Sequence, residues 1–214
     1  MKETALIFDL DGTLWDSSQS VAEIWTIKGK KSIDPNFSLT KEDVQALMGK
    51  TMKDILLSIA PKLSEDERSR IGEELLLSEN DYLVDHPGVL FPEELETLNS
   101  LREEGYRLFI VSNCQLGYIE KFLSLVPKTL FEGHLCWGDT HDEKAVTIRR
   151  LMKERNISKA IYIGDTNGDE NASNRAGIPF FHAKYGFGKA EKPAVALPSL
   201  SSLPEALRAY FDQR

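Results

Sequence analysis

Short, unbroken apolar runs alternate with amphipathic helical segments along most of this chain, and this alternation is the feature that most restricts its fold. Four runs have the length of strands and cover residues 5–8, 107–111, 160–163 and 178–183. Apart from Arg107 and His182, apolar residues in these runs follow one another rather than alternate with polar ones, which is typical of strands that are covered on both faces. Between the runs, segments 91–104 and 142–154 carry apolar residues at helical spacing. The sequence therefore predicts an α/β fold with a Rossmann-like parallel sheet.

The stretch from residue 17 to residue 84 departs from this alternation, because it shows helical patterns and no strand. Its helices are predicted over 20–28, 41–48, 52–60 and 65–84, and the polar residues 28–37 predict a loop. The turn-forming run Asp85-His86-Pro87-Gly88 marks the return to the alternating pattern. We therefore expect two domains, a Rossmann-like core formed by residues 1–16 and 85–214 and an inserted all-helical cap formed by residues 17–84.

Polar residues follow three of the four predicted strands, at the point where each strand ends. The first strand leads into Asp9-Leu10-Asp11-Gly12-Thr13, the second into Ser112-Asn113, and the third into the run from Gly164 to Asp169. In open α/β sheets, ligands bind beyond the carboxyl ends of the strands. We therefore expect these groups to converge on one crevice.

Asp9 and Asp11 are the pair that most needs an explanation. Residues two apart on a strand point to the same side, so both carboxylates are expected to face one place. Like charges so close together raise each other's pKa unless a cation or hydrogen bonds compensate. Together with Asp165 and Asp169, they form an oxygen-rich set of the kind that selects Mg²⁺ over softer metals. The sequence thus predicts a magnesium site, and Lys144 could add a point charge for an anion.

The composition narrows the partners and the location. The net charge is −8 and no Lys- or Arg-rich run appears, which argues against a nucleic-acid partner. No apolar stretch approaches the length of a membrane span, and the N-terminus lacks the features of a signal peptide. We therefore expect no membrane partner and a reducing, cytoplasmic location. Cys114 and Cys136 lack the spacing of a zinc site and are predicted to be buried free thiols.

Taken in order, D-L-D-G-T-L, S-N, Lys144 and G-D-T-N-G-D resemble the four motifs of the haloacid dehalogenase-like (HAD) hydrolase superfamily. The helical insertion resembles the C1-type cap of its phosphoglycolate phosphatase-like and β-phosphoglucomutase-like branch. The resemblance covers essentially the whole chain, including Ala176-Gly177-Ile178 and Tyr185-Gly186-Phe187-Gly188. The chain departs from the family in one respect, because Lys144 precedes an alanine where a proline is usual.

The resemblance implies a role for each acid of these motifs. Asp9 would attack phosphorus and form an aspartyl-phosphate, and Asp11 would protonate the leaving oxygen and then deprotonate the hydrolytic water. Asp9 and Asp165 would ligate Mg²⁺ through their side chains, and Asp11 would do so through its backbone carbonyl. Asp169 would support the metal through a water molecule.

The resemblance also implies which residues hold the substrate. Ser112, Asn113 and Lys144 would bind the phosphoryl oxygens. In the cap, Lys50 falls between two predicted helices, and either Lys50 or Lys53 could meet a second anionic group of the substrate or simply face solvent.

Four functions are compatible with these motifs. The favoured one is a Mg²⁺-dependent phosphatase that acts on a small phosphorylated metabolite, with phosphoglycolate-like compounds and sugar phosphates as the first candidates. A β-phosphoglucomutase-like mutase usually carries a cap histidine where this chain has Val21, and a dehalogenase lacks the acid that is present here as Asp11. A catalytically inactive binding module is expected to have lost an acid, but all four are present. The oligomeric state, monomer or homodimer, is left open.

Overall fold

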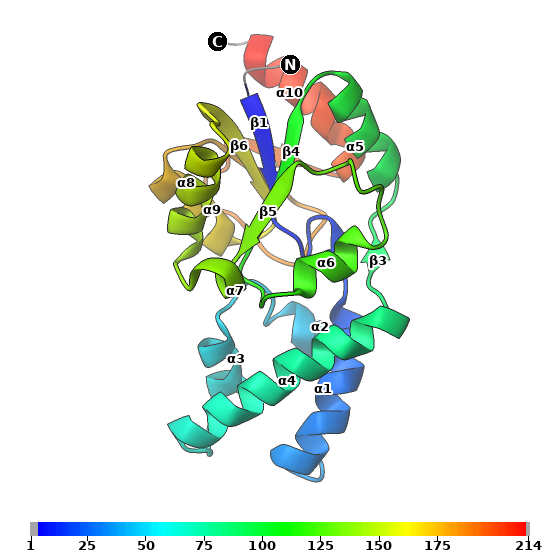
Figure 1. Ribbon diagram of the computed structural model, residues 1–214, viewed down its shortest axis with the longest axis vertical. Helices are drawn as coiled ribbons and strands as arrows, with labels where there is room; N and C mark the ends of the chain where they lie inside the picture. The colour runs from blue at the N-terminus through cyan, green and yellow to red at the C-terminus, as the bar shows by residue number, and fades with distance from the viewer. Residues whose placement is uncertain (1–3, 213–214) are drawn as a thin grey trace.

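A parallel β-sheet lies at the centre of the structure, a computed structural model that describes residues 4–212. Its strands follow the order β5-β4-β1-β6-β7-β8, and every neighbouring pair is parallel. Strand β1 lies in the middle, between β4 and β6 (Figure 1). The predicted α/β fold with a Rossmann-like parallel sheet is confirmed. The strands are β1 (Thr4–Phe8), β4 (Arg107–Ser112), β5 (Gly133–Cys136), β6 (Lys159–Gly164), β7 (Phe180–Ala183) and β8 (Val195–Leu197).

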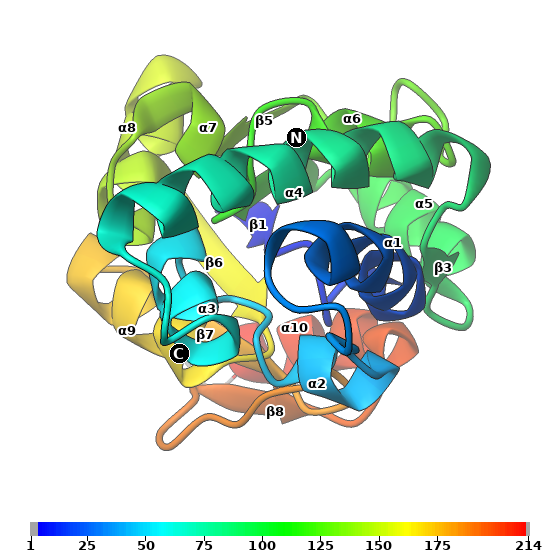
Figure 2. The ribbon, with the colours of Figure 1, turned by 90° about the horizontal axis from the view of Figure 1, so that it is seen from below.

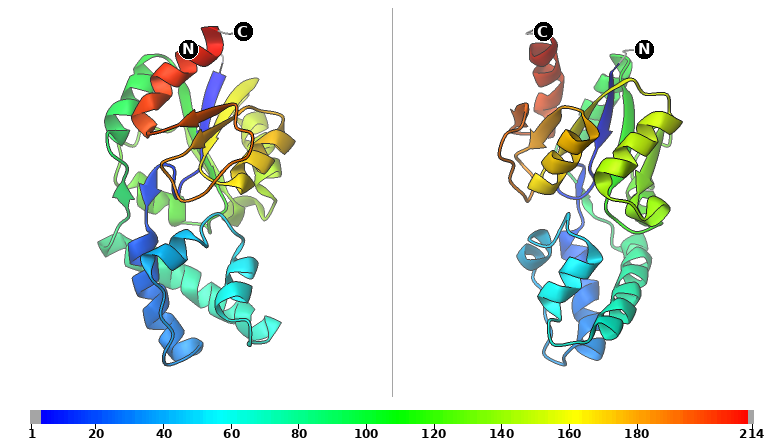
Figure 3. Two further views of the ribbon diagram at one scale, coloured as in Figure 1. Left: turned by 180° about the vertical axis from the view of Figure 1, so that it is seen from behind. Right: turned by 90° about the vertical axis from the view of Figure 1, so that its left-hand side faces the viewer.

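Helices cover both faces of this sheet (Figure 3). One face packs against α5 (Glu94–Glu103), α6 (Tyr118–Leu123) and α10 (Leu203–Asp212), and the other packs against α8 (Lys144–Glu154) and α9 (Asn167–Ala176). A short helix, α7 (Trp137–Thr140), follows β5, and a 3₁₀ turn, Leu200–Ser202, precedes α10. In β1, Leu6 and Phe8 belong to the first apolar cluster, whereas Ala5 and Ile7 belong to the second. Burial on both sides explains why residues 5–8 of this strand are all apolar.

Two strands of the sheet, β5 and β8, lie outside the sequence prediction. They form the two edges of the sheet, they are short, and most of their residues are only partly buried or exposed. Edge strands of this kind lack the continuous apolar run that marks the inner ones. The strand predicted over 178–183 begins at Phe180.

Four helices account for the segment 17–84, which was predicted as the cap. They are α1 (Ser18–Ser32), α2 (Lys41–Gln45), α3 (Met52–Ile59) and α4 (Glu65–Asp85), the last of which ends one residue beyond that segment. They pack around an apolar cluster of their own, built from residues such as Trp25, Ile55 and Leu75. Figure 2 shows α4 lying across the cap beside α1 and α3. The domain boundaries themselves stay a prediction.

Two cap helices differ in length from the prediction. Helix α1 continues to Ser32, so the loop predicted from residue 28 begins later; Lys30 and Lys31 in its last turn suit the negative end of the helix dipole. Helix α2 ends at Gln45, and a turn in which the N–H groups of Leu47 and Met48 donate to the carbonyl of Val44 leads to Gly49, whose φ is +80°.

Two short strands connect the cap to the rest of the chain. Strand β2 (Trp15–Asp16) enters the cap and pairs antiparallel with β3 (Val89–Leu90), which leaves it.

The cysteines are free thiols, as predicted, although Cys114 is only half-buried while Cys136 is buried. No helix within residues 4–212 is both long enough and apolar enough to cross a membrane.

Candidate active site

Three carboxylates meet where the two central strands end. Asp9 directly follows β1 and Asp165 directly follows β6, and these strands are paired in register with Phe8 opposite Ile163. Asp169 lies in the first turn of α9. Carboxylate oxygens of Asp9, Asp165 and Asp169 all lie within 4.8 Å of one another, and all three side chains are buried. The structure thus brings together three of the predicted acids, as the strand-end pattern predicts.

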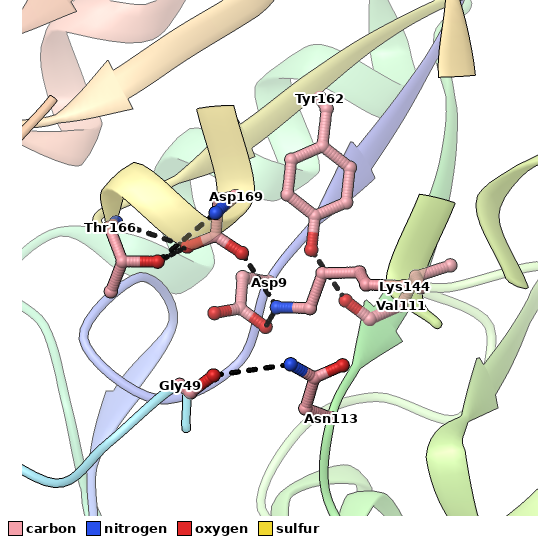
Figure 4. A network of polar contacts seen from close by, with 8 residues as sticks. All are labelled: Asp9, Gly49, Val111, Asn113, Lys144, Tyr162, Thr166 and Asp169. Carbon is pink, nitrogen blue, oxygen red and sulfur yellow. Dashed lines mark hydrogen bonds and ion pairs between the residues drawn. The ribbon is translucent and has the colours of Figure 1, made fainter. Parts of the chain in front are cut away.

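Lys144 lies between two of these acids. Its Nζ donates to Oδ1 of Asp9 at 3.0 Å and to Oδ1 of Asp169 at 2.6 Å (Figure 4). The lysine is the first residue of α8 and is 7% exposed. The aromatic ring of Tyr162, 5.8 Å from Nζ, covers its other side. Lys144 is therefore fixed as a buried point charge beside Asp9, and the alanine that follows it does not displace it.

Asp169 is held in place by the start of its own helix. Its backbone N–H donates to Oγ1 of Thr166 at 3.1 Å, and its Oδ2 accepts from the backbone N–H of Thr166 at 3.0 Å and from its hydroxyl at 2.6 Å. This capping box satisfies two backbone donors and fixes the carboxylate rotamer. As a result, Oδ1 of Asp169 points at Lys144 (Figure 4).

The cluster carries more negative charge than its lysine can balance. Burial, followed by the charge of Asp169, raises the pKa of Asp9 to about 7, although Lys144 opposes the shift. Burial and the charges of Asp169 and Asp9 hold the pKa of Asp165 well above its ordinary value. Burial works against the charge of Lys144, but Asp169 and Asp9 keep the pKa of its ammonium group well above the usual range. Because one lysine cannot neutralise three carboxylates, a further cation beside them would be stabilising.

Asp165 provides the observation that a metal ion fits here. Its Oδ2 accepts from the backbone N–H groups of Phe187 and Gly188, at 2.8 and 3.1 Å. Its Oδ1 is buried and has no hydrogen-bond partner among the described residues. Burying a carboxylate oxygen without a hydrogen-bond donor destabilises the folded state unless a cation lies beside that oxygen. Oxygen donors from Asp9, Asp165 and Asp169 are the ligands that hard divalent cations prefer.

Gly12 keeps the turn after β1 close to Asp165. Its φ is +76°, and a Cβ atom at this position would lie 2.3 Å from Oδ2 of Asp165. Only glycine meets both the left-handed backbone and this close approach.

Asp11 has a different set of partners from Asp9. Strand β1 ends at Phe8, and a tight turn in which the N–H groups of Thr13 and Leu14 donate to the carbonyl of Leu10 follows it. Asp11 therefore lies in this turn rather than on a continuous strand, yet Asp9 and Asp11 both line the cleft between the cap and the sheet. Burial raises the pKa of Asp11 to about 6, and hydrogen bonds from neighbouring donors oppose this shift.

A cleft of about 1000 Å³ separates the cap from the sheet and contains most of the predicted site residues. Its lining includes Asp9, Asp11, Ser112, Asn113 and Lys144 from the core, and Lys50 and Lys53 from the cap. The volume lies at the upper end of what small-molecule sites usually enclose.

The remaining predicted residues are placed around this cleft. Ser112 is buried at the end of β4, and Asn113 donates from Nδ2 to the carbonyl of Gly49 in the cap at 3.1 Å. Lys53 forms an exposed ion pair with Glu65 at 2.9 Å. Lys50 is exposed and forms no ion pair with any residue from 4 to 212, so it is the freer of the two lysines to meet a substrate.

Ser17 and Tyr118, whose hydroxyls donate to Asp11, and Thr166, which caps α9 beside Asp169, are site residues that the sequence did not identify. Thr166 had a signal, because a threonine three residues before an acid at a helix start is typical of a capping box. Tyr118 had none, since its contact with the site depends on the packing of α6.

Comparison with known proteins places the chain among hydrolases of one family. The haloacid dehalogenase-like hydrolase family matches residues 6–183. Phosphoglycolate phosphatase from Aquifex aeolicus is 31% identical over 196 residues, which is 86% of each chain. Pyrophosphatase PpaX from Listeria monocytogenes is 25% identical over 180 residues, covering 82% of this chain and 80% of that protein.

Solved structures agree with this assignment at the level of the fold. A haloacid dehalogenase-like family hydrolase from Streptococcus pneumoniae superposes with a TM-score of 0.81 at 24% identity, over 99% of this chain and 100% of that one. The resemblance drawn from the four motifs and the prediction of an enzyme are confirmed: the chain belongs to the haloacid dehalogenase-like hydrolase family.

Proposed function

We propose that this protein is a Mg²⁺-dependent phosphatase that hydrolyses small phosphate monoesters in the cytoplasm through an aspartyl-phosphate. The observation that carries the proposal is the position of Asp9, which lines the cleft while its carboxylate is joined to Lys144 and lies beside Asp165 and Asp169. A carboxylate nucleophile, a buried lysine and a set of metal-ligating acids are the parts that phosphoryl transfer requires. The relatives named phosphatase and pyrophosphatase support the same class of reaction.

The reaction proceeds in two steps that share the same acids. A carboxylate oxygen of Asp9 bonds to phosphorus as the bond to the leaving oxygen breaks, and Asp11 gives its proton to that oxygen. Water then attacks the phosphorus of the aspartyl-phosphate while Asp11 takes one of its protons, and inorganic phosphate leaves as Asp9 is regenerated. Ser112, Asn113 and Lys144 bind the phosphoryl oxygens in both steps.

The acids of the cluster would hold the metal. Asp9 and Asp165 would bind Mg²⁺ with side-chain oxygens, Asp11 with its backbone carbonyl, and Asp169 through water. When bound, the ion supplies positive charge that stabilises the phosphoryl oxygens. The partnerless Oδ1 of Asp165 supports this assignment.

Val21 favours hydrolysis over the mutase alternative. It lines the cleft and is 1% exposed, at the position where the related mutases carry a histidine. An aliphatic side chain there cannot exchange a proton with a sugar hydroxyl. The name of one relative supports phosphoglycolate-like compounds as a first candidate substrate. Sugar phosphates are the other first candidate, and Lys50 is the residue proposed for a second anionic group.

The test is the hydrolysis of p-nitrophenyl phosphate by the wild type and by Asp9→Asn. The substitution removes the nucleophilic oxygen but keeps the shape of the side chain, so activity should disappear while the circular dichroism spectrum stays the same. Excess EDTA should abolish activity of the wild type, and added Mg²⁺ should restore it. Full activity of Asp9→Asn, or undiminished activity in EDTA, would exclude this mechanism. A panel of phosphorylated metabolites, followed by phosphate release, then identifies the substrate.

A further inference from the structure

Three donors converge on a single oxygen of Asp11. Oδ1 accepts from Nε1 of Trp15 at 2.9 Å, from Oγ of Ser17 at 2.8 Å and from the hydroxyl of Tyr118 at 2.8 Å. We call these three residues the acid clamp. Trp15 and Ser17 lie where the chain enters the cap, whereas Tyr118 lies on α6, 107 residues away from Asp11.

Tyr118 is built into the core so that its hydroxyl has little freedom. The side chain is 1% exposed, and its ring packs edge-on against Trp15 with the ring centroids 5.5 Å apart and the planes at 76°. The hydroxyl also lies 2.7 Å from Oγ of Ser17. Burial, with the charges of Asp11 and Glu79, keeps the pKa of Tyr118 well above its ordinary value, so the hydroxyl remains a donor.

The other oxygen of Asp11 is left for chemistry. Within residues 4–212, the hydrogen bonds made by this carboxylate all end on Oδ1, and Asp11 lines the cleft. A carboxyl group anchored through one oxygen has one fixed orientation, and its second oxygen then carries the proton in a defined direction. The clamp donors also stabilise the carboxylate that forms when the proton leaves.

From this geometry we infer that the acid clamp positions Asp11 for proton transfer to the leaving group. Tyr118 is the member of the clamp that comes from α6. The inference rests on the proposed function. As the phosphorus–oxygen bond breaks, its electron pair stays with the leaving oxygen, which takes the proton from Oδ2 of Asp11. In the second step, Oδ2 takes a proton from water as the new phosphorus–oxygen bond forms and the bond to Asp9 breaks. Tyr118 is thus a positioning residue that acts through Asp11.

Two aryl esters of nearly the same shape test this role in Tyr118→Phe. Phenolate is a poor leaving group that needs the proton, whereas p-nitrophenolate leaves readily without it. Tyr118→Phe should therefore lower kcat/KM for phenyl phosphate by about tenfold and that for p-nitrophenyl phosphate by less than about threefold, since the whole general acid contributes roughly 10²–10⁴. If Tyr118 had a merely structural role, Tyr118→Phe would lower both kcat/KM values by the same factor. Equal losses of kcat/KM for the two esters, or no loss for either, would overturn the inference.

Controls separate this inference from the proposed function. Tyr82→Phe removes a tyrosine hydroxyl that donates to Glu23 in the cap, and it should leave both rates unchanged. If Tyr118→Phe fails to fold, Ser17→Ala removes another clamp donor and should give the same unequal loss; equal losses in that variant would also overturn the inference. A wild type that hydrolyses neither ester would reject the proposed function and this inference with it. A wild type active on both, with equal losses in the variants, would reject the inference alone.

Discussion

Lys144 is the residue whose removal should disturb the site most, because it is the cation that touches both Asp9 and Asp169. Lys144→Met keeps most of the side-chain volume but leaves two buried carboxylates without their partner. Above the pKa of Asp9, and without added metal, we expect the free energy of unfolding to fall by about 3–5 kcal/mol. Urea unfolding measures this change.

A matched control for this substitution lies on the same helix. Lys153→Met replaces an exposed lysine of α8 and should leave the unfolding midpoint nearly unchanged. If Lys144→Met were as stable as Lys153→Met under these conditions, the lysine would not carry the charge balance described here.

Residues of the site were predictable from sequence where the backbone alone determines their place. Asp9 and Asp165 directly follow neighbouring parallel strands, so their meeting follows from the sheet. The donors to Asp11, which are Trp15, Ser17 and Tyr118, were not predictable, since these contacts depend on where β1 ends and how the next turn runs. The part played by Tyr118 depends on the packing of α6, which no local pattern specifies.

At the scale of the element, the inner strands and the helices α1 to α5 and α8 were predicted, whereas the edge strands and the helices α6, α7, α9 and α10 were not. A strand buried on both faces must be apolar at every position, and this run is visible in sequence. Edge strands β5 and β8 need fewer apolar residues and so leave no clear pattern. Helix ends differed in the cap, where α1 runs on to Ser32 with Lys30 and Lys31 in its last turn and α2 ends at Gln45.

Helix α4 carries a buried acid whose effect on stability depends on pH. Glu79 is 5% exposed, and among residues 4–212 only its Oε1 accepts a hydrogen bond, from Nε2 of Gln115 at 3.1 Å. Burial raises its pKa from 4.5 to about 8. The folded state therefore binds this proton more tightly than the unfolded state. The resulting stabilisation is complete below pH 4.5 and is lost as the pH rises through about 8.

Glu79→Gln should flatten the pH dependence of stability. A single group of this kind lowers the free energy of unfolding by at most about 1.4 kcal/mol per pH unit between the two pKa values. Urea unfolding at several pH values in that window should show a smaller slope for Glu79→Gln than for the wild type. Glu73→Gln, at an exposed position of the same helix, should keep the wild-type slope. Equal slopes in all three proteins would show that Glu79 is not protonated in the folded state.

At the scale of the whole molecule, the loop that follows β4 is where the core contacts the cap. Asn113 donates to the carbonyl of Gly49, and Gln115 donates to the side chain of Asn80 at 3.1 Å. Asn80 in turn donates to the carbonyl of Leu116 at 2.9 Å. Ser112, one of the proposed phosphate ligands, ends β4 directly before this loop, so the loop joins the proposed phosphate site to the contacts with the cap.

We predict that the stability of the whole chain depends on metal, because the cluster of Asp9, Asp165 and Asp169 joins the ends of β1 and β6 to the start of α9. A ligand that binds only the folded state at a hundredfold excess over its Kd adds about 2.7 kcal/mol, and each kcal/mol raises the unfolding temperature of a chain of this size by roughly 2–4 °C. Saturating Mg²⁺ should therefore raise the unfolding temperature of the wild type by about 5–10 °C.

Asp165→Asn identifies the source of this effect, because it removes the charge beside the partnerless Oδ1 and keeps the side-chain shape. Without metal, the variant should be at least as stable as the wild type, since one of three crowded carboxylates becomes neutral. Adding Mg²⁺ should leave the unfolding temperature of Asp165→Asn unchanged. Glu73 lines the cleft but lies outside the cluster, so Mg²⁺ should raise the unfolding temperature of Glu73→Gln as it does that of the wild type. Differential scanning calorimetry with and without Mg²⁺ measures all three. An equal rise in Asp165→Asn would place the ion elsewhere, and no rise in the wild type would mean that the cluster does not bind Mg²⁺ in the folded protein.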